Sequence, residues 1–167
     1  HEVDNDYAGD ISEEPHVDPD DFYHRRVAAY RAFFEHQPLR RRSLVTPDGR
    51  MRIWGQAAFG DLAEIFLTDG RQYRSPIACP TETDRGGNII PESCPDLADE
   101  TRSYLGARQE GWLNRSFGRG PARWNIMVQP TLFSPFAGAM AGEEPGVWSD
   151  GWDGYPAARA RLTSMFA

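Results

Sequence analysis

Residues 62–67 (Leu-Ala-Glu-Ile-Phe-Leu) form a nearly continuous apolar run that ends at the turn Thr68-Asp69-Gly70. Such a run, closed by turn residues, is typical of a buried strand. Residues 123–129, with Trp-Asn-Ile-Met-Val at their centre, predict a second buried strand. A short helix is predicted between the two, from about residue 106 to 115, with Leu105, Gln109, Trp112 and Leu113 along it. The strand–helix–strand order predicts an α/β (α+β) layered fold.

The clearest helix of the chain lies upstream of these elements, from Pro19 to His36. Asp18 is a good N-cap, and Pro19 suits the first helical position. Apolar and aromatic side chains then recur at helical spacing until Pro38 stops the run. A last helix is predicted over residues 156–166.

The remaining segments give weaker patterns. Residues 51–54 alternate apolar and polar side chains and predict a strand. Residues 76–99 are expected to form a long irregular excursion, and residues 130–154, rich in Gly, Pro and Trp, are expected to form a loop. Three tryptophans are expected to anchor the core: Trp112, Trp124 and Trp152. So few strands make a thin sheet, which suggests part of a larger one.

Composition limits the possible functions. The 167 residues suit one domain with a real core, and a net charge of −7 argues against nonspecific binding to nucleic acid or anionic lipid. No apolar run approaches the length of a membrane span, and no export signal is present. All 18 basic residues are arginines, so arginine is the sole permanent cation available to hold an anion. The oligomeric state stays open.

The first nine residues (His-Glu-Val-Asp-Asn-Asp-Tyr-Ala-Gly) are dense in groups that bind metals or transfer protons. An EF-hand loop counted from Asp4 places Gly9 correctly but has Ala8 and Pro15 where oxygen ligands are needed. An alternative to a catalytic role is a noncatalytic module that is stabilised by calcium or binds a partner through this acidic loop.

Two cysteines, Cys79 and Cys94, lie fifteen residues apart in the irregular excursion. A disulfide between them would stabilise the chain by about 3 kcal/mol in the loop-entropy model. Two free buried thiols are the alternative, and the disulfide is favoured if the protein is exported.

Six short motifs occur in the order found in the alkaline phosphatase D (PhoD-like) family. Residues 1–9 resemble the second half of the family motif Trp-Asp-Asp-His-Glu-Val-(Asp/Glu)-Asn-Asn, and residues 22–40 resemble its arginine-pair helix. The other similar segments are residues 59–74, 105–113, 123–129 and 152–156. Gly70 and Pro130 depart from the family pattern, where Thr and Gln are usual. Six motifs in order across the whole chain make a strong resemblance.

The resemblance implies a metallophosphoesterase-like sandwich of two β-sheets flanked by helices. It also implies an exported, extracytoplasmic enzyme that hydrolyses phosphate monoesters and diesters using iron and calcium. The substrate would be a phosphate ester, and multivalent cations would neutralise its charge.

The resemblance also assigns roles to individual residues. His1 matches the motif histidine that stabilises the transition state or protonates the leaving oxygen. Asn5 offers an amide to metal or phosphate, with a turn-forming Asn as the alternative. Arg26, with Arg25 beside it, could clamp phosphate through two hydrogen bonds, and a surface arginine that pairs with the nearby acids is the alternative. Arg26 is preferred because it lies on the helix face of Phe22 and Tyr30. Arg71 and Tyr73 are expected to be structural.

Other motifs of the family are missing from these residues. The carboxylates that precede the motif histidine, the upstream Asp-Tyr and Cys motifs and the downstream Gly-Asp-Val-His segment are absent. Residues 1–167 are therefore expected to be the central part of a catalytic domain, without its N-terminal and C-terminal metal-ligand segments. Such a chain should have little or no phosphatase activity by itself.

Overall fold

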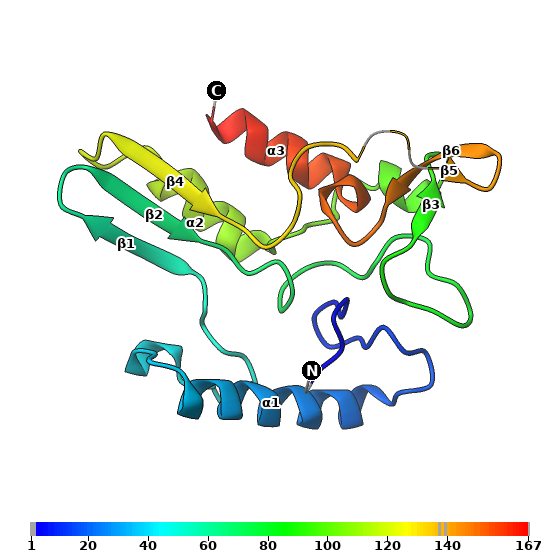
Figure 1. Cartoon of the computed structure of the whole chain (residues 1–167), viewed down its shortest axis with the longest axis horizontal. Helices are drawn as coiled ribbons and strands as arrows, with labels where there is room; N and C mark the ends of the chain where they lie inside the picture. Colours follow the sequence, from blue (N-terminus) through cyan, green and yellow to red (C-terminus); the bar gives the residue numbers. More distant parts are fainter. Residues whose placement is uncertain (1–2, 137, 139, 167) are drawn as a thin grey trace.

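The computed structural model describes residues 3–136, 138 and 140–166 (Figure 1). In these ranges the chain forms the helices α1 (Pro19–His36), α2 (Ala107–Ser116) and α3 (Pro156–Phe166). Strands β1 (Gly55–Phe59), β2 (Ala63–Leu67) and β4 (Trp124–Val128) make one sheet in the order β1-β2-β4. The second sheet contains β3 (Ile89–Pro91), β6 (Glu144–Trp148) and β5 (Met140–Ala141) in the order β3-β6-β5. The predicted α+β class, two sheets and three helices are confirmed.

The first sheet carries its core on one face only. β1 runs antiparallel to β2, and β2 runs parallel to β4, with α2 in the connection. Phe66 and Met127 are paired neighbours on β2 and β4 and point to the face that α2 and α3 cover. The buried cluster on this face comprises Phe66, Tyr104, Leu105, Leu113, Trp152, Tyr155, Ala158 and Leu162.

The opposite face of this sheet is apolar and uncovered in the part of the chain that the structure describes. Trp124 is 65% exposed, and Ile126 and Val128, which point to the same side of β4, are also exposed. The prediction that Trp124 anchors the core is therefore wrong, because alternation along β4 turns its side chain away from α2 and α3. Trp152 is buried, and Trp112 packs against the edge of the core, as predicted.

Two predicted irregular segments contain the second sheet. β3 lies within residues 76–99, and β5 and β6 lie within residues 130–154, so the prediction of uninterrupted loop there is wrong. These strands are short and include Pro91, Pro145 and Gly146, which hides them from sequence patterns. Beside them a disulfide links Cys79 and Cys94, and Cys94 packs with Ala78 and Ile90 in a small separate cluster.

The prediction of a strand over residues 51–54 is also wrong. The backbone N–H of Met51 donates to Gln72 Oε1 at 2.8 Å, and Gln72 Nε2 donates to the Met51 carbonyl at 2.7 Å. One side-chain amide thus takes both hydrogen bonds that a neighbouring strand would make. The strand forms instead at β1, where Gln-Ala-Ala gives little propensity signal and pairing with β2 decides the structure.

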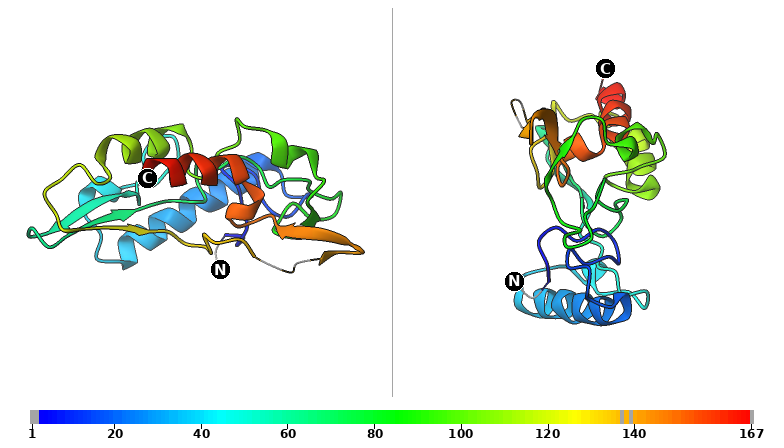
Figure 2. Two further views of the ribbon diagram at one scale, coloured as in Figure 1. Left: turned by 90° about the horizontal axis from the view of Figure 1, so that it is seen from above. Right: turned by 90° about the vertical axis from the view of Figure 1, so that its right-hand side faces the viewer.

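Helix α1 packs against the N-terminal loop and against the turn at Gly49. Asp18 caps it as predicted, accepting a hydrogen bond from the Asp20 N–H at 2.9 Å. The right-hand view of Figure 2 shows α1 on one side of the molecule and α2 and α3 on the other, with the N-terminal loop between them. None of the described helices has the length and apolar character needed to cross a bilayer.

Two phenylalanines on opposite faces of the first sheet provide a test of this architecture. Phe66 is 0% exposed and Phe59 is 71% exposed. We expect Phe66→Ala to lower the free energy of unfolding by about 3–5 kcal/mol, because it opens a cavity in the main core. Phe59→Ala should change that free energy by less than about 0.5 kcal/mol. Urea denaturation followed by circular dichroism measures both, and equal losses would contradict the assignment of the two faces.

Candidate functional site

The candidate site is the N-terminal loop, whose centre is a tight turn. The backbone N–H of Ala8 donates to Ile11 O at 3.0 Å, and the N–H of Ile11 donates to Ala8 O at the same distance. Gly9 takes a positive φ of 61° in this turn, where a side chain would be strained. Its N–H donates to Arg71 O at 2.9 Å, which ties the turn to the segment that follows β2.

Arg74 binds the backbone of the N-terminal loop. Its side chain is 0% exposed, and its guanidinium donates to the carbonyl of Asp6 at 2.7 Å and to that of Tyr7 at 2.9 Å. The same guanidinium donates to Asp150 O at 3.0 Å and pairs with its carboxylate at 2.8 Å. Arg74 therefore joins the N-terminal loop to the segment before α3.

Asp150 receives a second arginine. Arg71 forms a two-pronged ion pair with its carboxylate, with one N–O distance of 2.9 Å, and lies 3.7 Å from Asp6 Oδ1. Burial by itself raises the pKa of the Asp150 carboxyl, but Arg71 and Arg74 outweigh burial and hold this pKa below its ordinary value. Arg71 thus has the structural role that we expected for it.

Buried amides fix the turn that carries these arginines. Asp69 accepts hydrogen bonds from the N–H groups of Arg71 at 2.9 Å and Gln72 at 3.1 Å. Gln109 of α2 bonds both the N–H and the carbonyl of Asp69, each at 2.9 Å. Burial raises the pKa of Asp69 even though these donors oppose it. The segment after β2 is therefore a rigid support for the loop above it.

A tyrosine pair connects the loop to α1. The hydroxyl of Tyr7 makes a short hydrogen bond with that of Tyr30, and the ring of Tyr7 packs on Phe22. Burial raises the pKa of Tyr7 to about 12, and it raises the pKa of Tyr30 as well. Both phenols therefore keep their protons, and this link persists, through mildly alkaline pH.

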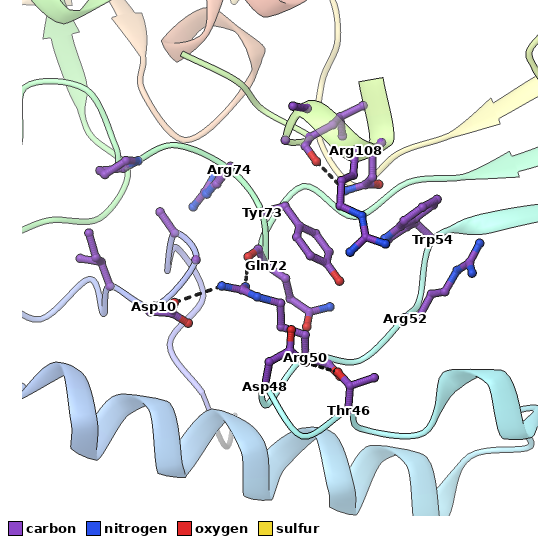
Figure 3. A pocket seen from close by; sticks show the side chains of 18 residues that line it. Asp10, Thr46, Asp48, Arg50, Arg52, Trp54, Gln72, Tyr73, Arg74 and Arg108 are labelled. Atoms are coloured by element: carbon purple, nitrogen blue, oxygen red, sulfur yellow. Dashed lines mark hydrogen bonds and ion pairs between the residues drawn. The ribbon is translucent and has the colours of Figure 1, made fainter. Parts of the chain in front are cut away.

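Arg26 also binds the loop from α1. Its side chain is fully buried, donates through Nη1 to Gly9 O and pairs with Asp10 Oδ1 at 2.5 Å. Arg50 completes the arrangement by pairing with the other oxygen of Asp10 at 3.0 Å (Figure 3). Helical spacing correctly placed Arg26 on the face of Phe22, but that face is turned into the protein.

Two other predicted site residues are accessible to solvent. Asn5 of the loop is exposed, and Arg25 of α1, with a side chain 47% exposed, reaches Asp4 Oδ1 at 3.5 Å. Asn5 and Arg25 are thus exposed, whereas Arg26 is buried. His1 lies outside the described residues. Sequence reasoning missed Asp150, which stood in a predicted loop, and quoted Arg74 only as part of a motif.

The carboxylates of the loop bind groups of the protein itself. Asp4 accepts the hydroxyl of Ser12, and Asp6 Oδ2 accepts the N–H of Gly87 at 3.0 Å. The closest grouping of potential ligands in the described ranges is Cys79, Cys94 and Asp96. Its two cysteines form the disulfide and cannot ligate a metal.

Comparison with known structures identifies the class of protein. A solved structure described as that of PhoD superposes with a TM-score of 0.83 and 34% sequence identity, covering 99% of this chain and 30% of that chain. The chain therefore has the α+β fold of a phosphatase.

Comparison of sequences identifies the family. The family model described as "PhoD-like phosphatase" matches residues 1–167. Alkaline phosphatase D of Bacillus subtilis (strain 168) is 36% identical over 166 residues, which are 99% of this chain and 27% of that protein. The chain belongs to the PhoD-like phosphatase family, and it spans less than a third of the length of these two relatives.

The ion pairs of Asp150 predict a pH-dependent loss of stability. At pH 7 we expect Asp150→Asn to lower the free energy of unfolding by about 3–5 kcal/mol, because it leaves buried Arg74 without its counter-ion. The native pKa of Asp150 is depressed, so its contribution is complete above the unfolded value of about 3.9 and is lost as pH falls through the native value.

Urea denaturation of the wild type and Asp150→Asn between pH 7 and pH 3 measures this difference. Both proteins retain Asp69, so its opposite shift cancels in the comparison. Asp61→Asn, at an exposed carboxylate in the β1–β2 turn, is the control and should follow the wild type. A difference for Asp150→Asn that stays constant down to pH 3 would contradict the assigned ion pairs.

Proposed function

We propose that this chain forms part of an enzyme that hydrolyses phosphate monoesters and diesters in a metal-dependent reaction. The observation that carries the proposal is the match to alkaline phosphatase D of Bacillus subtilis, 36% identical over 99% of this chain. The fold supports it, because the buried side chains of Arg74 and Arg26 bind the loop at Asp6 and Gly9. A residue that contacts a reacting phosphoryl group needs a rigid support to hold it in the correct geometry.

We further propose roles for four residues of this loop and of α1. His1 stabilises charge on the phosphoryl oxygens or protonates the leaving oxygen, and Asn5 offers its exposed amide to phosphate or to a metal. The guanidinium of Arg25 is accessible for charge-assisted hydrogen bonds to phosphate. Arg26 was expected to be catalytic, but its complete burial against Gly9 and Asp10 favours a positioning role.

Iron and calcium are the metals that we propose for the complete enzyme. Among the described residues, the group of three or more His, Cys, Asp or Glu side chains close enough to share an ion is Cys79, Cys94 and Asp96, whose cysteines form the disulfide. We propose that residues 1–167 are the central part of the catalytic domain and that other segments supply the principal ligands. The uncovered apolar face of the first sheet supports this assignment, because a folded domain normally buries such a surface.

We also propose an extracytoplasmic location. The disulfide between Cys79 and Cys94 supports this location, because such bonds persist in oxidising compartments.

A chimera provides the test of these roles. This chain would replace the matching 166-residue segment of the Bacillus subtilis alkaline phosphatase D, and hydrolysis of p-nitrophenyl phosphate and bis(p-nitrophenyl) phosphate would be measured with iron and calcium. We expect metal-dependent turnover by the chimera. His1→Ala and Arg25→Gln should each lower kcat/KM by about 100-fold or more, because both groups stabilise charge in the transition state.

The control for this test is Arg31→Gln, an exposed arginine on the same helix, which should stay within about twofold of the parent chimera. Circular dichroism establishes that each variant is folded. Full activity in folded His1→Ala and Arg25→Gln chimeras would exclude the proposed roles.

The isolated chain should behave differently from the chimera. We expect the purified 167-residue chain to hydrolyse neither substrate above the buffer rate, with or without added iron and calcium, because we propose that other segments of the domain supply the principal metal ligands. Turnover that depends on added metal and disappears in His1→Ala would show instead that the chain carries a working site.

A further inference from the structure

A cleft of about 690 Å³ opens between four segments of the chain (Figure 3). Neither Asn5 nor Arg25 lines it. Its walls come from the turn at residues 8–11, from residues 46–54, from residues 72–76 and from the start of α2. This volume lies within the range of pockets that take small organic ligands and exceeds the needs of one inorganic ion.

The charges in this cleft divide into paired and unpaired groups. Arg50 is paired with Asp10, and Arg74 is paired with Asp150. The side chains of Arg52 and Arg108 also line the cleft, and they have no carboxylate partner among the residues that the structure describes.

One carboxylate of the cleft remains after these pairings. Asp48 accepts the hydroxyl of Thr46, and in Figure 3 it lies beside Thr46, away from Arg108 and Trp54. The two unpaired arginines therefore leave the end of the cleft near Trp54 positive.

Aromatic rings give the cationic end an apolar wall. The guanidinium of Arg52 lies over the Trp54 ring, 4.6 Å from its centroid, and that of Arg50 lies 5.3 Å from the centroid of Tyr73. Stacking fixes the plane of Arg52 and leaves the N–H groups at its edge available as donors. Leu105 and Ile11 add apolar surface to the same cleft.

The start of α2 adds oriented backbone donors. Gly106 has a positive φ of 77°, and a Cβ there would lie 2.8 Å from the Tyr73 carbonyl oxygen, so glycine lets the helix begin against this wall. No side chain caps the helix, and the first-turn N–H groups of Ala107 and Arg108 have no partner in the described ranges. Such groups favour an anion.

From this combination we propose that the cleft binds an anionic phosphoryl compound that carries a planar apolar group. The phosphoryl oxygens meet Arg108, Arg52 and the start of α2, and the planar group lies along the wall that Trp54 and Tyr73 form. The inference does not depend on the proposed catalytic function, because binding here requires neither metal nor turnover.

Phenylphosphonate is a suitable probe, because its carbon–phosphorus bond resists hydrolysis by phosphatases. The 15N-labelled chain would be titrated with it in the presence of a chelator, and the indole N–H signals of the five tryptophans would be followed by NMR. Trp54→Phe identifies the signal of Trp54. We expect a saturable shift of this signal, at least tenfold weaker binding of methylphosphonate, and no saturable shift with benzyl alcohol.

Two variants of α2 give the decisive comparison. Arg108→Gln, at an exposed position, should weaken phenylphosphonate binding about tenfold or more. Arg115→Gln, at an exposed arginine of the same helix that does not line the cleft, should bind as the wild type. Arg52→Gln should weaken binding in the same way as Arg108→Gln.

Three results would each overturn the proposal: no shift of the Trp54 signal, equal affinity for methylphosphonate, or unchanged binding by Arg108→Gln. Circular dichroism of each variant separates a lost ligand contact from a lost fold. Because the probe is not hydrolysed and no metal is present, failure of the chimera as a phosphatase would leave this result unaffected, and the reverse also holds.

Discussion

The position of the candidate site depends on one buried cation. Arg74 is completely buried, and its guanidinium binds backbone carbonyls of the N-terminal loop together with the backbone and carboxylate of Asp150. These partners lie 67 to 76 residues away along the chain. The carboxylate of Asp150 neutralises this guanidinium, and an unpaired buried charge would cost several kcal/mol. The loop, the segment after β2 and the segment before α3 therefore hold their positions together.

Local patterns in the sequence predicted the elements whose stability is local or whose apolar run is long. The strands at residues 62–67 and 123–129 and all three helices are present. The failures involve partners that a local pattern does not show. The predicted strand at residues 51–54 is replaced by the amide of Gln72, and β3, β5 and β6 arise from pairing between short segments. Trp124 is exposed because hydrophobicity alone does not tell which face of a sheet is covered.

The candidate site, like the fold, was predicted only in part from the sequence. Resemblance to the family directed attention to residues 1–9 and to the arginine pair, but sequence spacing could not tell a ligand-binding arginine from one that supports the loop. Arg26 lies on the apolar face of α1, as predicted, and for that reason it is buried against the Gly9–Asp10 turn. Asp150 gave no signal, because its role exists only once Arg71 and Arg74 have been brought beside it.

A chain whose only permanent cation is arginine must use this side chain both to build its scaffold and to meet anions, and the partners of each guanidinium separate the two uses. Arg26, Arg71 and Arg74 are bound to carboxylates and carbonyls of the protein itself. Arg52 and Arg108 stand at a cleft without carboxylate partners among the described residues. Arginine is well suited to both tasks, because its planar fork can saturate several fixed acceptors in the interior and can grip a phosphoryl group at the surface. The absence of a carboxylate partner at an accessible cleft, rather than the residue type, then indicates where an anion can bind.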